Sequence, residues 1–220
     1  MTPVPFVKLN SGISIPQIGL GVYELPDKEQ CKSVVRDALA VGYRLIDSAQ
    51  RPLDQFYQNE RFVGEAIRES GLPREKVFVT TKVYQGFDNK EDLRANIQRS
   101  LDELGLSYID LFLMHSPLCG KEQRISTWRF LNEIRQEQGE KGIIRAIGVS
   151  NFGVSHLRQL REAGLPAPSV NQIEAYCPLM RGPQSKQSLG DGADWAGMPG
   201  RGWDAPVLRD LAEKVRRPSS

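Results

Sequence analysis

Short apolar segments rich in β-branched residues alternate with amphipathic helical segments along most of this chain, and this alternation constrains its fold most. The segments that predict strands start at residues 43, 77, 108, 143 and 169, so they lie 34, 31, 35 and 26 residues apart. Each interval holds a helical segment, which predicts βαβ units with parallel neighbouring strands. Doubly wound sheets and (β/α)8 barrels both satisfy this pattern, and periodicity alone does not distinguish them.

Individual elements follow from hydrophobic periodicity and helix-start signals. Segments 6–9 and 13–15 flank Asn10-Ser11-Gly12 and predict a hairpin, and 18–23 predicts a buried strand. Asp27 with Gln30, and Asp88 with Glu91, form capping-box patterns at two helix starts. The expected parallel strands are 43–47, 77–82, 109–114, 143–149 and 169–173, and the expected helices are 27–39, 59–70, 88–104, 125–136 and 154–163.

Composition excludes several classes of function. The net charge of +2 is spread through the chain and gives no basic surface for nucleic acid. No apolar run is long enough to span a membrane, and the N-terminus lacks the pattern of a signal peptide. Three well-separated cysteines and two histidines predict neither a disulfide framework nor a zinc site. We therefore expect a cytoplasmic protein without a metal.

Polar side chains stand at the carboxyl end of five successive expected strands. They are Asp47, Lys82, His115, the pair Ser150-Asn151 and the pair Asn171-Gln172. Each one alone has an ordinary explanation, such as a solvated charge or a helix cap, and His156 on an expected helix is given that interpretation. Together they lie at the end of a parallel barrel where active sites are assembled, which favours a functional site.

The segments around these residues resemble the aldo-keto reductase family from about residue 5 to residue 182. The matching stretches, in family order, are Gly19-Leu20-Gly21, Leu45 to Ala49, Tyr57-Gln58-Asn59-Glu60, Thr81-Lys82, Asp110 to His115, Gly148 to Phe152 and Asn171 to Glu174. The resemblance implies a (β/α)8 TIM-type barrel, an N-terminal hairpin closing its bottom, and NADPH bound across its top. A Rossmann interpretation of Gly19 and Gly21 fails, because Glu24 stands where the third glycine would be.

The resemblance also implies roles for the site residues. Tyr57 would be the general acid that protonates a carbonyl oxygen, and Lys82, held by Asp47, would lower the pKa of its phenol. His115 would bind the substrate by a hydrogen bond to the same oxygen. The cofactor-binding set implied by the family comprises Gly21, Val22, Asp47, Ser150, Asn151 and Gln172.

Three features depart from the family pattern. Asp47 and Tyr57 are ten residues apart, which implies an insertion at about 51–56. The stretch ending at Glu174 runs directly into one that resembles the family's next strand, without the dozen or more residues that a parallel crossover needs. Between Arg181 and Trp203 there are six glycines and two prolines in 23 residues, which predicts irregular or disordered chain.

These departures predict an incomplete barrel of about six parallel strands. The expected organisation is a barrel-like domain at 1–182, an irregular glycine-rich segment at 183–203, and a C-terminal helix and tail at 204–220. An open sheet edge would favour association or aggregation. No basic cluster follows Leu179 in the family's phosphate-loop context, so NADPH should bind weakly and be poorly distinguished from NADH.

The chemistry expected from the sequence is NADPH-dependent reduction of a small aldehyde or ketone to an alcohol by hydride transfer. The alternative is a catalytically impaired barrel fragment that acts only as a binding or regulatory protein. The complete set of Asp47, Tyr57, Lys82 and His115 favours the enzyme, whereas the lost barrel units favour the alternative. The sequence does not identify the carbonyl substrate.

Overall fold

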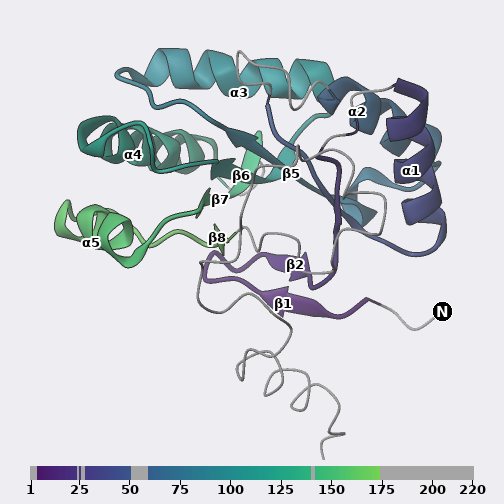
Figure 1. Cartoon of the computed structure of the whole chain (residues 1–220), viewed down its shortest axis with the longest axis horizontal. Helices are drawn as coiled ribbons and strands as arrows, with labels where there is room; N and C mark the ends of the chain where they lie inside the picture. Colours follow the sequence, from purple (N-terminus) through teal and green to yellow (C-terminus); the bar gives the residue numbers. More distant parts are fainter. Residues whose placement is uncertain (1–3, 24, 26–27, 51–58, 140–141, 174–220) are drawn as a thin grey trace, which may run out of the picture. The chain divides into compact units, whose positions relative to one another are not determined.

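The computed structural model describes residues 4–23, 25, 28–50, 59–139 and 142–173 (Figure 1). Within these residues a sheet of six strands has the order β3-β4-β5-β6-β7-β8, and every neighbouring pair is parallel. The strands are β3 Leu20–Gly21, β4 Leu45–Asp47, β5 Phe78–Val83, β6 Ile109–Met114, β7 Ile144–Ser150 and β8 Asn171–Gln172. The prediction of six parallel strands in sequential order is confirmed for this part of the chain.

The central strands are buried on both faces, which explains their almost continuous apolar sequence. Every residue of β5 is buried, and β6 and β7 each have a single residue that is only partly buried. On the inner face Phe78, Leu111, Leu113 and Ala146 form one apolar cluster. The outer face contributes to the larger core, which the sheet shares with the helices.

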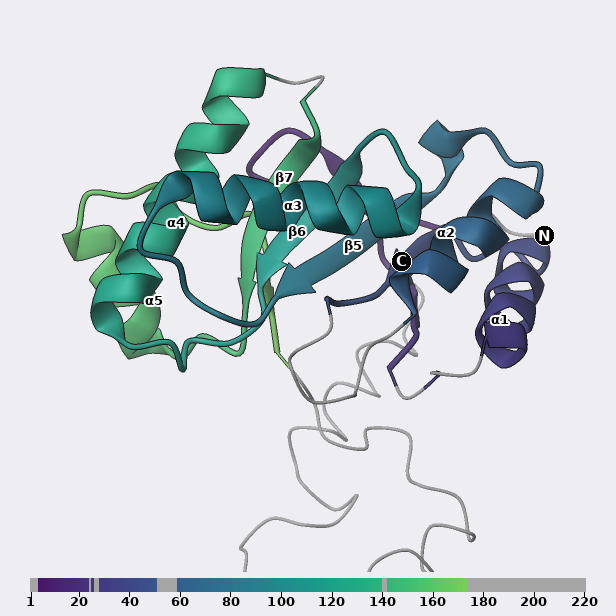
Figure 2. The same cartoon turned by 90° about the horizontal axis from the view of Figure 1, so that it is seen from above.

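Five helices lie around the outer side of the sheet, as Figures 1 and 2 show. They are α1 Lys28–Ala40, α2 Glu60–Glu69, α3 Lys90–Leu104, α4 Lys121–Gln138 and α5 Val154–Glu162. Each follows a strand in the chain and packs back on the sheet, so strand and helix alternate as in a (β/α) barrel. None of the helices in the described ranges has the length and apolar character needed to cross a membrane.

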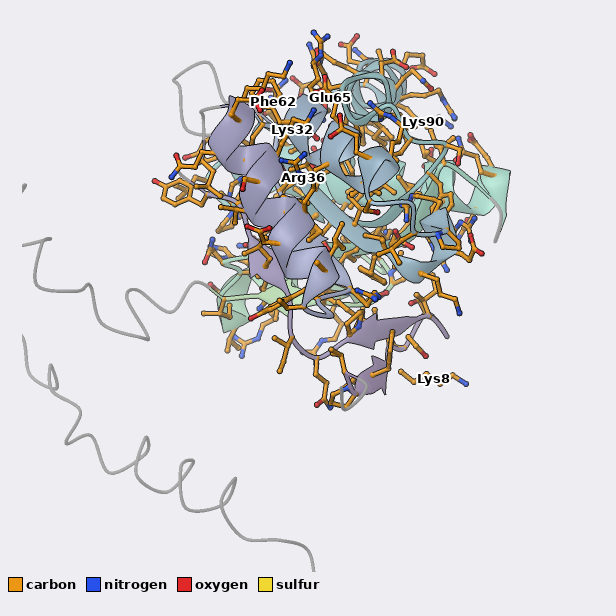
Figure 3. All side chains as sticks on the ribbon, turned by 90° about the vertical axis from the view of Figure 1, so that its right-hand side faces the viewer. Lys8, Lys32, Arg36, Phe62, Glu65 and Lys90 are labelled. Carbon is orange, nitrogen blue, oxygen red and sulfur yellow. The ribbon has the colours of Figure 1, made fainter. Side chains whose placement is uncertain are left out.

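Ion pairs join neighbouring helices at the surface. Lys32 on α1 lies 3.3 Å from Glu65 and 2.5 Å from Glu69, both on α2 (Figure 3). Lys90 on α3 makes similar contacts with Glu133 and Glu137 on α4. Solvent and salt screen such pairs at the surface, so the apolar core rather than these contacts holds the helices in place.

The N-terminal hairpin forms as predicted. Strand β1 Phe6–Lys8 pairs antiparallel with β2 Ser14–Pro16, and Gly12 takes a positive φ of 87° in the turn. Ile13 and Ile15 pack against the inner apolar cluster of the sheet. The hairpin therefore closes the interior at the end opposite the polar strand termini.

Several predicted boundaries were wrong. The capping residue of α3 is Asn89 rather than Asp88: the Asn89 side chain accepts from the backbone N–H of Asp92, at 2.8 Å. Asp88 instead accepts a hydrogen bond from Gln123 on α4. Helix α4 begins at Lys121 rather than near Ile125, because the chain already turns at Gly120, which has a φ of 85°.

Other predictions fall on residues outside the described ranges. They are the inserted segment at 51–56, Tyr57, the cap at Asp27, the junction at 174–175, the glycine-rich segment 183–203 and the C-terminal segment 204–220. The two predicted domain boundaries beyond residue 173, at 182/183 and 203/204, therefore stay predictions.

Candidate active site

An ion pair between β4 and β5 forms the centre of the polar cluster at the carboxyl end of the sheet. Asp47 ends β4, and its two carboxylate oxygens lie 2.8 and 2.9 Å from the Nζ atom of Lys82 on β5. Lys82 also donates to the backbone oxygen of Ser48 at 2.9 Å, and the lysine is only 2% exposed. A buried ammonium is tolerated only with such charged and polar partners, so Asp47 and the Ser48 oxygen fix the position of Lys82.

A residue on β8, the last strand in the sheet order, contacts the same ion pair. Gln172 on β8 donates through Nε2 to Asp47 Oδ2 at 3.2 Å. Three strands separate β4 from β8 in the sheet order, so a flat sheet would hold these residues far apart. The contact therefore shows that the sheet curls as a barrel does and brings polar groups from non-neighbouring strands together.

His115 follows β6 and faces this cluster. Its backbone N–H donates to Val83 at 2.8 Å, and the Tyr84 ring meets the imidazole edge-on with 5.7 Å between ring centroids. Burial, and secondarily the positive charge of Lys82, lower the pKa of His115 to about 4. The imidazole is therefore neutral at neutral pH, when it can offer one N–H donor without carrying charge.

Ser150 and Asn151 form a turn at the end of β7. Ser150 Oγ donates to the backbone oxygen of Gln172 at 2.9 Å, and the Asn151 side chain donates to Ser150 Oγ at 3.2 Å. Asn151 takes a φ of 61°, a left-handed conformation that asparagine accepts more readily than most residues. This turn leaves the Asn151 side chain exposed at the carboxyl end of the sheet, whereas Ser150 is buried.

Gly21 and Val22 lie beside Asp47 at the end of β3. A side-chain carbon added at Gly21 would meet nothing within 4 Å, so its backbone borders open space. Val22 is fully buried, its N–H donates to the Asp47 backbone oxygen, and its own oxygen accepts from Asn59 Nδ2. With both backbone groups engaged, Val22 could contact a cofactor only by packing.

Tyr57 lies outside the described residues, and the nearest described residue after it, Asn59, is held by buried hydrogen bonds. Asn59 is fully buried; it donates to Val22 and accepts from Ser48 Oγ at 3.0 Å. Sequence reasoning missed this role, although Asn59 belongs to the motif that carried the family resemblance. A polar residue directly before an amphipathic helix was the only available signal, and it predicts a cap rather than a long-range contact.

His156 has the ordinary structural role that was expected of it. His156 Nδ1 accepts from the Gly153 backbone N–H at 3.2 Å, so this histidine helps to cap α5. Among the residues that the structure describes, no group of three or more acidic, histidine or cysteine side chains could hold a metal ion. The polar cluster is thus an arrangement of one buried ion pair, a neutral imidazole and side-chain amides.

Comparison with known proteins assigns the fold and the cluster to a family. The profile of the aldo/keto reductase family matches residues 17–190, most of the chain, and the chain belongs to that family. Among curated relatives, a 9,11-endoperoxide prostaglandin H2 reductase from Trypanosoma cruzi is 44% identical over 80% of this chain and 58% of its own length. A glyoxal reductase from Bacillus subtilis is 38% identical over 94% of this chain and 73% of its own length.

Solved structures agree with this assignment. The crystal structure of an aldo-keto reductase from Bombyx mori in complex with NADP has a TM-score of 0.72 and 31% identity, covering 99% of this chain and 78% of that one. The fold class expected from the sequence is therefore confirmed as the α/β barrel type of this family. The chain spans less than two thirds of the T. cruzi reductase, so its own activity is a matter of proposal.

The described residues fit the nicotinamide half of a dinucleotide. Amide groups of Asn151 and Gln172 stand at the carboxyl end of β7 and β8 and can pair with a carboxamide, which both donates and accepts hydrogen bonds. Gly21 leaves open space beside Asp47, where a larger side chain would project. These groups suit a neutral planar ligand.

Proposed function

We propose that this protein reduces small aldehydes or ketones to alcohols with NADPH as the hydride donor. The observation that carries the proposal is the buried Asp47–Lys82 pair next to a neutral His115. Support comes from family membership, from the named activity of the glyoxal reductase relative and from the NADP complex of the Bombyx mori neighbour. Small aldehydes are the natural first substrates to test.

The chain's own groups would divide the work as follows. NADPH, when bound, would supply the hydride, and the amides of Asn151 and Gln172 would hold its carboxamide. The neutral imidazole of His115 donates a hydrogen bond to the carbonyl oxygen and orients it. Tyr57 then gives its phenolic proton to that oxygen, while the Lys82 ammonium favours the resulting phenolate. Asp47 holds Lys82 in place. Gly21, Val22 and Ser150 complete the proposed cofactor site.

The proposed reaction is tested by following NADPH oxidation by the purified full chain with a panel of small aldehydes, including glyoxal. Tyr57→Phe should remove nearly all turnover and leave cofactor binding, measured by NADPH fluorescence, within about twofold, because it deletes only the transferred proton. Phe62→Tyr on α2 is a matched control that adds a phenol without touching the cluster. Undiminished turnover in Tyr57→Phe would contradict the assignment of the general acid.

A second candidate function is binding of NADPH or a carbonyl compound without turnover. It spans 58% of the length of the T. cruzi reductase, and its described sheet has six parallel strands. A chain that binds NADPH or a carbonyl compound without turning it over would act as a binding or regulatory protein. NADPH titration that gives saturable binding, together with no oxidation of NADPH by any aldehyde in the panel, would favour this second function.

A further inference from the structure

A buried polar cluster lies between the sheet and α3, on the opposite side of β5 from the ion pair. It consists of Gln50, Glu60, Thr81 and Ser100, which we call the anchor cluster. Glu60 Oε1 accepts from Thr81 Oγ1 at 2.7 Å and from Ser100 Oγ at 2.8 Å. Ser100 Oγ in turn accepts from Gln50 Nε2 at 2.7 Å, and none of the four residues is more than 9% exposed.

The cluster joins two points of the chain on either side of Tyr57. Gln50 precedes the segment 51–58, and Glu60 begins α2 just after it. Ser100 on α3 contacts both, so a single hydroxyl connects the start and the end of that segment. Thr81 adds a link to β5 at the position before Lys82, and the Gln50 backbone N–H donates to the Lys82 oxygen at 2.9 Å. Gln50 and Glu60 are therefore both hydrogen-bonded to β5, the strand that carries Lys82.

We propose that Glu60 is a positioning residue that, through Ser100 and Thr81, fixes the segment bearing Tyr57 relative to Lys82. The inference rests on the proposed carbonyl reduction, in which the phenol and the ammonium must lie close together. Displacements of about 1 Å in such a pair can cost on the order of a hundredfold in rate.

A purely structural role would be met more cheaply by an uncharged side chain, because burying a carboxyl group carries a desolvation cost. The charged groups that face Glu60 are Glu103 and Arg99 of α3. Glu103 raises the pKa of the Glu60 carboxyl, and Arg99 lowers it. Burial raises the pKa of Glu60 to about 7, and the hydroxyls of Thr81 and Ser100 act in the opposite direction. The ionised carboxylate only accepts hydrogen bonds and so suits the two hydroxyl donors best. Attachment should therefore be firmest above about pH 7.

The experiment compares Glu60→Gln and Ser100→Ala in the full chain with two matched controls. Asp110→Asn removes another carboxylate that is largely buried and paired with Arg74 near the opposite end of the sheet. Thr127→Val removes a buried hydroxyl on α4 that accepts a hydrogen bond from the backbone N–H of Phe87. Turnover is measured as kcat and as the KM for NADPH across pH 5.5–9. The Tyr57 side chain is followed independently by 19F NMR after fluorotyrosine incorporation, with Tyr57→Phe assigning its signal.

We expect Glu60→Gln and Ser100→Ala to lower kcat at least tenfold while the KM for NADPH changes less than twofold. Glu60→Gln should also remove the loss of kcat that the wild type shows below about pH 7. In both variants the Tyr57 resonance should shift or broaden, and in Asp110→Asn and Thr127→Val it should match the wild type. An unchanged Tyr57 resonance in both cluster variants would overturn the inference, whether or not the chain is active. A resonance that responds as expected in a chain without turnover would uphold the positioning role and reject the proposed reaction instead.

Discussion

At the scale of single residues, the main feature of the polar cluster is a buried charge whose desolvation cost is offset by its hydrogen-bonding partners. Lys82 is nearly inaccessible yet meets the carboxylate of Asp47 and the oxygen of Ser48. His115 shows the converse, because burial beside that ammonium keeps its imidazole neutral. Burial, with a smaller contribution from the Lys82 ammonium, thus lowers the pKa of His115, and in the proposed reaction the same ammonium would also favour the phenolate.

Replacement of this cation tests its role directly. Lys82→Met keeps the length of the side chain but leaves the Asp47 carboxylate without its cation, so we expect the aldehyde reduction rate to fall at least about a hundredfold. Lys90→Met, which removes a partly exposed ammonium on α3, should leave the rate within about twofold. Both rates are measured by NADPH oxidation, with circular dichroism as the check on folding. Retention of most activity in folded Lys82→Met would exclude the ammonium from proton transfer.

Glu60 makes a separate prediction about stability. Its pKa is raised from 4.5 to about 7 in the folded chain, so between these values the folded state binds more protons than the unfolded state. The stability due to this group is therefore fully present below about pH 4.5 and is lost as pH rises through 7, by up to about 3 kcal/mol. Denaturant unfolding at pH 5 and pH 8 should show that Glu60→Gln is more stable than the wild type at the higher pH only. An equal effect of the substitution at both values would contradict this.

At the scale of elements, sequence patterns predicted the type and order of nearly every strand and helix but not how their ends are capped. Short, nearly continuous runs of apolar residues reflect local burial on both faces, so β5, β6 and β7 were found close to their true limits. The polar ends of these strands likewise indicated the site. Asn59, Glu60 and Ser100 were missed, because their partners lie far along the chain and no local pattern records them.

The cap of α3 offers a test at this scale. Asn89 accepts from the Asp92 backbone, so Asn89→Ala should lower the free energy of unfolding by about 1 kcal/mol. Asp88→Ala at the preceding position removes only a side-chain contact with Gln123 and should cost clearly less. Chemical denaturation of both variants gives the comparison. A larger loss for Asp88→Ala would mean that the helix starts one residue earlier than the structure indicates.

At the scale of the whole described unit, 4–173, stability is concentrated in the middle of the sheet. Strands β5, β6 and β7 pair over four or five residues on at least one side, whereas β3 and β8 pair over two residues with a single neighbour each. The site therefore spans regions of unequal strength: Lys82 stands on a firmly paired strand and Gln172 on a weakly paired one. A cofactor contact made by Gln172 would therefore depend on β8, a strand that pairs over only two residues.

Hydrogen exchange should reveal this gradient. Backbone amides of β6 are expected to exchange at least about a hundredfold more slowly than those of β3 and β8, because local opening costs less where fewer pairs and less apolar area are lost. Mass spectrometry of peptides from the exchanged protein measures the difference. If the amides of β8 were protected as strongly as those of β6, other parts of the chain would have to stabilise that strand.

The hydrogen bond between Gln172 and Asp47 has a consequence for how the protein is made. It joins residues 125 positions apart, so it can form only after most of the chain between them has folded. Contacts of such wide sequence separation are formed late, because the entropy of closing the intervening chain is lost before they contribute. During synthesis, Asp47 and Lys82 leave the ribosome long before Gln172. The polar cluster at the carboxyl end of the sheet would thus be completed last, once the strand at residues 171–172 had docked.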